Sequence, residues 1–112
     1  MLGICLGMQA VNRYFGGEIG KAPVPVHGKT SEIFHSHEGI FKGIPSPFIS
    51  ARYHSLAVSK IPSCLRKTAL TEDNIPMGLS HADYPVFGVQ FHPESYLSKY
   101  GKKLIRNFLE IS

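Results

Sequence analysis

Residues 1–15, MLGICLGMQAVNRYF, decide the fold that we expect for this chain. They contain a short apolar run, then Cys5-Leu6-Gly7, and then apolar residues at helical spacing. This order predicts a strand, a sharp turn and a helix. The Gly16-Gly17 pair that follows is typical of a helix end, because glycine tolerates positive φ angles. Cys5 therefore stands at the apex of a strand–turn–helix unit.

The residues around this cysteine have the form G-x-C-x-G, which is the thiol counterpart of the G-x-S-x-G nucleophile elbow. We expect Gly3 and Gly7 to be required, since side chains there would collide where the strand and the helix fold back on each other. The dipole and the N–H groups at a helix amino terminus also favour a thiolate. Taken alone, the pattern fits equally well a buried cysteine beside two incidental glycines.

The rest of the chain is predicted to form short strands and one further helix. Polar and apolar residues alternate, as in short antiparallel strands, in 28–35, 48–53, 65–71 and 77–81. A strand is also expected at 18–21, whereas the two prolines in 22–26 allow only an edge strand or a connection. Residues 86–91 form a more apolar strand, and the apolar spacing in 96–111 predicts an amphipathic helix. These elements indicate an α/β fold.

A second motif, His92-Pro93-Glu94, follows the apolar strand 86–91. On an extended segment an imidazole and a carboxylate two residues apart point to the same face, and Pro93 restricts the backbone between them. The preceding strand would deliver His92 to the carboxyl end of a sheet, where Cys5 also leaves its strand. We therefore expect a thiol, a base and an orienting carboxylate to converge.

Composition indicates one globular domain, since 43% of the 112 residues are hydrophobic and 18% are charged. The net charge is +4, but the basic residues lie in scattered clusters, which argues against a nucleic-acid-binding surface. No apolar run approaches the roughly 18 residues that span a bilayer, and no basic secretory leader precedes the first strand, so we expect a cytoplasmic protein and no membrane partner. In a reducing compartment Cys5 and Cys64 are separate thiols, Cys64 a half-buried filler.

The histidines of His35-Ser-His37-Glu38 raise the question of a metal site. The stretch has no second ligand pair at zinc spacing, so we interpret it as a polar loop between strands, with a turn at Gly39.

Two segments, Gly3–Gln9 and Gln90–Glu94, resemble the paired signatures of class I glutamine amidotransferases, in the same order. Between them, His27–Ser31 (HGKTS) and Arg52–Leu56 (RYHSL) resemble the glutaminase component, component II, of anthranilate synthase and aminodeoxychorismate synthase. The resemblance covers essentially the whole chain. It implies a flavodoxin-like α/β fold, in which helices flank a mixed sheet.

The resemblance implies a role for each matching residue. Cys5 would be the nucleophile, His92 the general base and then acid, and Glu94 the residue that orients His92. The backbone N–H of Leu6 would be an oxyanion donor, and glutamine would be bound by Gln9, Ser55 and Leu56. Gln9 lies one helical turn after Cys5, so its amide can face the same cleft. Without the resemblance, Ser55 and Leu56 fit a loop hydroxyl and a core leucine. Met8 stands where many relatives carry histidine, which we interpret as a packing change.

The implied function is hydrolysis of L-glutamine to glutamate and ammonia, which a chorismate-binding synthase subunit would receive in a heteromer, without a metal or organic cofactor. The family's oxyanion loop has no counterpart before the first strand, which would also lack sheet neighbours. We therefore expect residues 1–112 to be the C-terminal part of the domain, without the N-terminal half, and to have little activity alone.

Alternative interpretations stay open at this point. Other amidotransferase branches feed guanylate, cytidylate or carbamoyl phosphate synthesis, although the HGKTS and RYHSL strings argue against them. The chain could also be a catalytically silent fragment or interaction module. Anthranilate and aminodeoxychorismate synthesis are equally compatible with the sequence.

Overall fold

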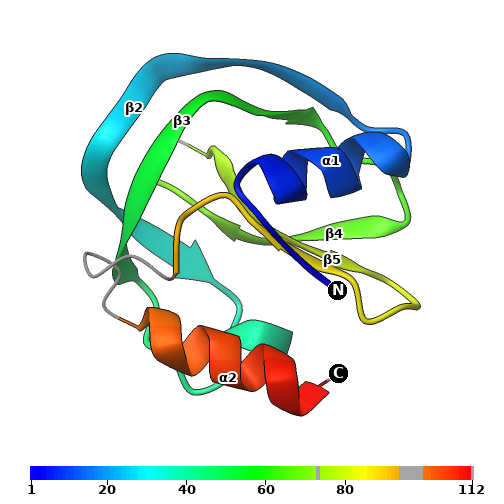
Figure 1. Cartoon of the computed structure of the whole chain (residues 1–112), viewed down its shortest axis with the longest axis vertical. Helices are drawn as coiled ribbons and strands as arrows, with labels where there is room; N and C mark the ends of the chain where they lie inside the picture. Colours follow the sequence, from blue (N-terminus) through cyan, green and yellow to red (C-terminus); the bar gives the residue numbers. More distant parts are fainter. Residues whose placement is uncertain (73, 94–99, 112) are drawn as a thin grey trace.

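The structure, a computed structural model, describes residues 1–72, 74–93 and 100–111, apart from the side chains of 22–29 and 51–55. Within these ranges the chain forms a six-stranded sheet in the order β1-β6-β5-β4-β2-β3, with α-helices and a short 3-10 helix (Figure 1). The elements in chain order are β1 (Leu2–Ile4), α1 (Leu6–Tyr14), β2 (Glu18–His35), η1 (Gly39–Phe41), β3 (Phe48–Lys60), β4 (Leu65–Leu70), β5 (Pro76–His81), β6 (Phe87–Val89) and α2 (Gly101–Ile111). The predicted α/β class is confirmed.

The sheet is mixed, because β1 and β6 run parallel while the other described neighbours are antiparallel. Because β1 and β6 are parallel, their carboxyl ends lie side by side at the same end of the sheet. There the N–H of Cys5 donates to the carbonyl oxygen of Val89 at 2.7 Å. The expectation that the strand before His92 ends where Cys5 leaves its own strand is confirmed.

Strands β2 and β3 are longer than predicted, and together they arch over α1 (Figure 1). Their antiparallel pairing extends from Glu18 opposite Lys60 to Ile33 opposite Phe48, with register shifts on the way. The two prolines of 22–26 lie in the gap between the pairs of Lys21 and Val26. The prediction of an edge or a connection is confirmed, because only Val26 of this segment has a described partner, on β3, and the strand skips pairing around the prolines.

Helix α1 begins directly after Cys5 and ends at Tyr14, and Gly16 has a φ of 98°, which confirms the predicted helix end. Its buried residues Met8 and Val11 pack with Val58, Leu65 and Leu79, and the half-buried Cys64 packs against this cluster as predicted. Helix α2 begins at Gly101, later than the predicted start at 96, while residues 94–99 lie outside the described residues.

A second core joins α2 to the sheet and to η1. It contains the fully buried Phe41, Phe91 and Leu104. The Asn107 amide donates to the backbone carbonyl groups of Ile40 and Lys42, each at 2.8 Å, and so ties the helix to η1.

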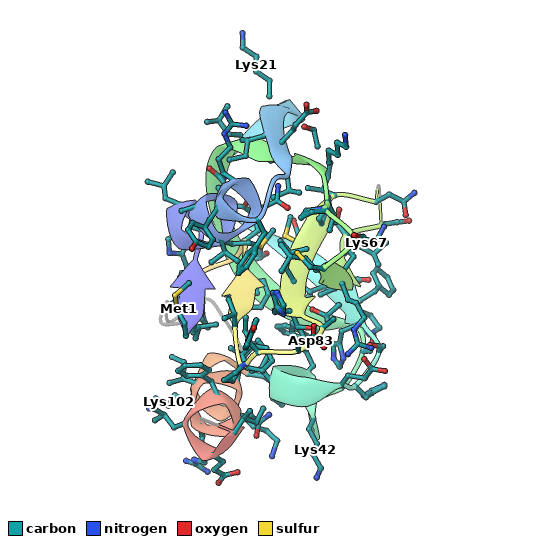
Figure 2. All side chains as sticks on the ribbon, turned by 90° about the vertical axis from the view of Figure 1, so that its right-hand side faces the viewer. Met1, Lys21, Lys42, Lys67, Asp83 and Lys102 are labelled. Atoms are coloured by element: carbon teal, nitrogen blue, oxygen red, sulfur yellow. The ribbon has the colours of Figure 1, made fainter. Side chains whose placement is uncertain are left out.

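Labelled lysines lie at both ends of the molecule (Figure 2). Lys42 and Lys102 lie at the end formed by η1 and α2, whereas Lys21 extends from the opposite end (Figure 2). All three are exposed. Their separation is consistent with the scattered charge seen in the sequence. Among the described residues, no helix has the length and apolar character that crossing a membrane requires.

Candidate active site

Cys5 occupies the turn between β1 and α1 with a strained backbone. Its φ of 55° and ψ of −104° lie outside the regions that side-chain-bearing residues favour. Such a conformation costs on the order of 1–3 kcal/mol and persists only where the surrounding structure imposes it. Here the hydrogen bond to Val89 and the start of α1 hold the residue from both sides. A half-buried thiol at the apex of a strained strand-to-helix turn is the geometry that the elbow motif predicts.

The two glycines of the motif differ in their surroundings. A Cβ added to Gly3 would lie 2.5 Å from the carbonyl oxygen of Gly7, which is backbone and cannot move freely. The steric reason expected for Gly3 is therefore confirmed. A Cβ on Gly7 would meet no described atom within 4 Å, so the same expectation was wrong for Gly7 as far as the described residues go.

A line of side-chain amides leads from β3 to the Cys5 sulfur. Gln9 Nε2 donates to the Leu56 carbonyl oxygen and to Gln90 Oε1, each at 3.1 Å. Gln90 Nε2 in turn lies 3.4 Å from Cys5 Sγ and donates to it. Both amides are buried, since Gln9 is 4% exposed and Gln90 is fully enclosed. Helix α1, strand β3 and the end of β6 thus meet at the Cys5 sulfur.

The structure brings several of the predicted substrate-binding residues to this place. Gln9 and Leu56 are joined by a hydrogen bond, and the side chain of Leu56 is 41% exposed. Ser55 precedes Leu56 in β3, but its side chain lies outside the described part of the chain. Leu6 is the first residue of α1. In the first turn of a helix the backbone N–H groups have no helical partner, which is what a donor to an oxyanion requires.

His92 and Pro93 continue from the end of β6, two and three residues after Gln90. His92 is half-buried and Pro93 is buried. Glu94, the predicted third member of the triad, lies outside the described residues. The catalytic roles of Cys5, His92 and Glu94, that of the Leu6 N–H, and those of Gln9, Ser55 and Leu56 in binding glutamine stay predictions.

The His-Pro segment rests against the first residue of α2. A Cβ on Gly101 would overlap the carbonyl oxygen of Pro93, so only glycine permits this close approach. Helix α2 therefore helps to determine where the segment after β6 lies.

The histidines of 35–38 form a different arrangement. His35 Nδ1 accepts the backbone N–H of His37 at 3.0 Å, so Nε2 carries the proton in the neutral ring and donates to the Pro45 carbonyl at 2.9 Å. Burial lowers the pKa of His35 below its usual value of 6.5, and the neighbouring His37 lowers it further, against the opposing effect of the backbone carbonyl. The segment forms the predicted polar turn, with Gly39 at a φ of 56°.

Sequence reasoning missed two residues of the site. Gln90 was visible as a polar residue at the end of the apolar run VFGVQF, but its direction depends on the pairing of β6 with β1. Gly101 carried no signal in the sequence, since it precedes a basic helix face and contacts Pro93 only in the folded chain.

The chain is similar to known proteins of one family. The model of the family described as Glutamine amidotransferase class-I matches residues 1–111. The chain is 50% identical to anthranilate synthase component 2 of Azospirillum brasilense, over 97% of this chain and 57% of the relative. It is 45% identical to the aminodeoxychorismate/anthranilate synthase component 2 of Bacillus subtilis, over 98% of this chain and 58% of the relative.

A solved structure from Thermoplasma acidophilum, assigned as a component of a GMP synthase, superposes with a TM-score of 0.93 at 32% identity, over 98% of this chain and 55% of that one. The chain thus spans about half the length of the proteins that it matches.

Proposed function

Because the chain belongs to the class I glutamine amidotransferase family, we propose that it carries the catalytic residues of a glutaminase subunit that supplies ammonia to a chorismate-using synthase. The observation that carries this proposal is the strained Cys5 at the strand-to-helix turn, with its sulfur contacted from the end of β6. The same strand leads into His92-Pro93-Glu94. A nucleophile, a base and an orienting acid would then meet at one edge of the sheet.

In the proposed reaction the Cys5 thiolate attacks the side-chain amide carbon of L-glutamine and forms a tetrahedral intermediate. The backbone N–H of Leu6 stabilises the oxyanion. His92 gives its proton to the departing ammonia, which leaves a glutamyl thioester on Cys5. The same imidazole then activates the water that hydrolyses the thioester to glutamate, while Glu94 keeps the ring in the required orientation.

The synthase partner follows from the product and from the relatives. Ammonia is protonated in bulk water, so it is useful only where a second active site receives it directly. The relatives at 50% and 45% identity are named as components of anthranilate and aminodeoxychorismate synthases. We therefore propose a heteromer with a chorismate-binding subunit in the cytoplasm. The guanylate branch is the second candidate, supported by the structure at 32% identity, and the higher identities favour the chorismate branch.

The site would be completed by a further part of the domain. Strand β1 stands at the end of the strand order and pairs with β6 on one side among the described strands. Its other edge could pair with a strand of an N-terminal half, which would also supply the second oxyanion donor. This proposal agrees with the chain's spanning 57% of the Azospirillum brasilense relative.

Replacement of the nucleophile tests the function in a complex of the chain, the upstream segment and the synthase. Cys5→Ser should lower glutamine-dependent product formation by about 10⁴-fold or more, because the hydroxyl is a far weaker nucleophile in a site built for a thiolate. Product formation from added ammonium salt should continue, since the synthase does not need the thiol. Aminobenzoate or aminodeoxychorismate release, measured with each nitrogen source, separates the two activities.

Cys64→Ser is the matched control and should leave both activities intact, because Cys64 is a half-buried residue that packs against the hydrophobic cluster around Met8 and Leu65. A wild-type complex that makes product from ammonium salt and never from glutamine would instead support the silent module. If the chain supplied ammonia to a synthase of the guanylate branch, the chorismate-using partner would be wrong, but the glutaminase function would stand.

A further inference from the structure

We propose that Gln90 is a further catalytic residue, which donates a hydrogen bond to the Cys5 sulfur and stabilises the thiolate, and that Gln9 and the Leu56 carbonyl hold Gln90 in the donating orientation. The inference deepens the proposed function and rests on it for its purpose. The hydrogen bonds that direct the Gln90 amide to the thiol all join described residues.

The orientation of both amides follows from one backbone group. The Leu56 carbonyl oxygen can only accept, so the Gln9 atom that faces it at 3.1 Å must be the nitrogen. The second hydrogen of that nitrogen is directed to Gln90 at 3.1 Å, so the facing atom of Gln90 must be its oxygen. The other end of the Gln90 amide is then the nitrogen, and it faces Cys5 Sγ at 3.4 Å. The fold thus determines that the sulfur meets a donor.

Burial makes this orientation stable. If Gln90 turned over, its NH₂ group would face the NH₂ group of Gln9, and its oxygen would face the sulfur. The two facing NH₂ groups would lie in the interior, where Gln90 has no exposed surface and Gln9 only 4%, and the oxygen would repel the sulfur once it is a thiolate. An unsatisfied buried polar group loses its hydration without compensation, so the flipped arrangement is strongly disfavoured. The three participating elements, α1, β3 and the end of β6, are each anchored in the sheet or core.

The consequence is chemical. A thiolate accepts a hydrogen bond much more strongly than a neutral thiol, so a fixed N–H donor favours the ionised form. The amino terminus of α1 acts in the same direction. When the sulfur forms the proposed thioester it loses its charge, and the same donor then favours return of the thiolate as the leaving group. A neutral amide provides this stabilisation without taking a proton itself.

Other titratable groups lie on the segments that meet at the sulfur. His92 follows Gln90 by two positions. Glu94 follows in sequence, outside the described residues. On the packed elements, Arg13 lies in the last turn of α1 and Lys60 at the far end of β3. Substitutions of Gln90 leave all four unchanged.

The test measures the Cys5 thiol and involves no glutamine. Alkylation by iodoacetamide is followed against pH in the full chain, with the Cys5 and Cys64 peptides quantified separately by mass spectrometry. In Gln90→Met, a neutral side chain of similar length without an N–H, the apparent thiol pKa of Cys5 should rise by about one unit, a roughly tenfold loss of thiolate at neutral pH. Gln90→Glu should raise it further, because a carboxylate replaces the donor.

Asn12→Leu is the matched control. Asn12 is fully buried, as Gln90 is, and lies in α1, where its amide donates to the carbonyl oxygens of Glu18 and Lys60 at 3.2 and 3.0 Å. Its loss should destabilise the fold comparably and leave the Cys5 alkylation profile within about twofold. If a Gln90 variant does not fold, an NMR titration of the wild-type chain tests the same hydrogen bond. The side-chain amide protons of Gln90 should then shift with the same apparent pKa as the thiol.

The outcomes are decisive in each case. An unchanged Cys5 profile in folded Gln90 variants, an equal change in Asn12→Leu, or Gln90 amide protons that ignore the thiol titration would overturn the proposal. A shifted thiol pKa in a chain that never hydrolyses glutamine within its complex would leave the inference standing and overturn the proposed function. An unchanged thiol pKa with intact glutaminase activity would do the reverse.

Discussion

Two polar clusters near strand ends, the elbow around Cys5 and the turn at 35–38, use their polar atoms in opposite ways. In the turn, both ring nitrogens of His35 contact backbone groups, and the ring stacks on Phe41 with centroids 4.8 Å apart and planes at 17°. At the elbow the backbone is strained, and a buried amide donates to a sulfur. The presence of histidines therefore does not identify a site. A side chain whose partners are all backbone groups is structural, whereas strain and donors directed at a nucleophile indicate chemistry.

The greatest change is expected at the junction of the His-Pro segment with α2. In Gly101→Ala the new methyl group would overlap the Pro93 carbonyl, so the helix or the segment must move, at a cost of about 3 kcal/mol. In the active complex we expect kcat for glutamine hydrolysis to fall more than tenfold with a smaller change in KM, because His92 is displaced while Gln9 and Leu56 stay in place.

The neighbouring exposed residue provides the control. Lys102→Ala should change neither kcat nor the free energy of unfolding, since the side chain faces solvent. Steady-state kinetics and denaturant unfolding check both variants. A Gly101→Ala protein with wild-type kcat would show that the position of α2 does not influence the site.

Next in size is the difference between the two glycines of the elbow. Gly3→Ala should destabilise the chain by about 2 kcal/mol and slow the alkylation of Cys5, because its methyl group would lie 2.5 Å from a backbone oxygen. Gly7→Ala should be neutral, or more stable by about 0.5 kcal/mol, because alanine favours the first turn of α1. Urea titrations of both variants provide the measurement. A loss of stability in Gly7→Ala only when the upstream segment is added would indicate that this segment occupies the open space.

The smallest effect is a pH dependence that belongs to the turn alone. Burial keeps the pKa of folded His35 below 6.5, so as the pH falls below 6.5 the unfolded chain binds the proton first and the free energy of unfolding decreases. The stability that His35 contributes through its lowered pKa is fully present above pH 6.5, and it is lost as the pH falls through the pKa of the folded state. In His35→Gln the free energy of unfolding should fall less steeply as the pH decreases. The effect of His37→Gln should be smaller, because burial is the larger cause.

Unfolding curves between pH 5 and 8 measure this slope, and alkylation of Cys5 is followed in the same samples. We expect no change at the thiol in either variant, since the turn shares no hydrogen bond with the elbow among the described contacts. A His35→Gln variant that altered Cys5 reactivity would contradict the separation of the two clusters.

Local pattern was sufficient for the elbow and for the order of its parts. The apolar spacing of 1–15, the glycine pair after it and the strand before His92 each reflect neighbours close in sequence, and the structure has them where they were predicted. The family resemblance rests on the same short segments, and the comparisons confirm it. The Gly3 requirement also followed from local geometry, because the colliding atoms lie within five residues of one another.

Tertiary structure alone decided the features that depend on distant partners. The lengths of β2 and β3 come from their pairing with each other, which maintains a strand through two prolines. Gln90 contacts the sulfur because the parallel register sets Ile4 opposite Val89, and its amide is oriented by a carbonyl on β3. Gly101 matters only because α2 packs on Pro93. Periodicity records which face of an element is apolar, whereas the direction of a hydrogen bond depends on atoms brought together from far along the chain.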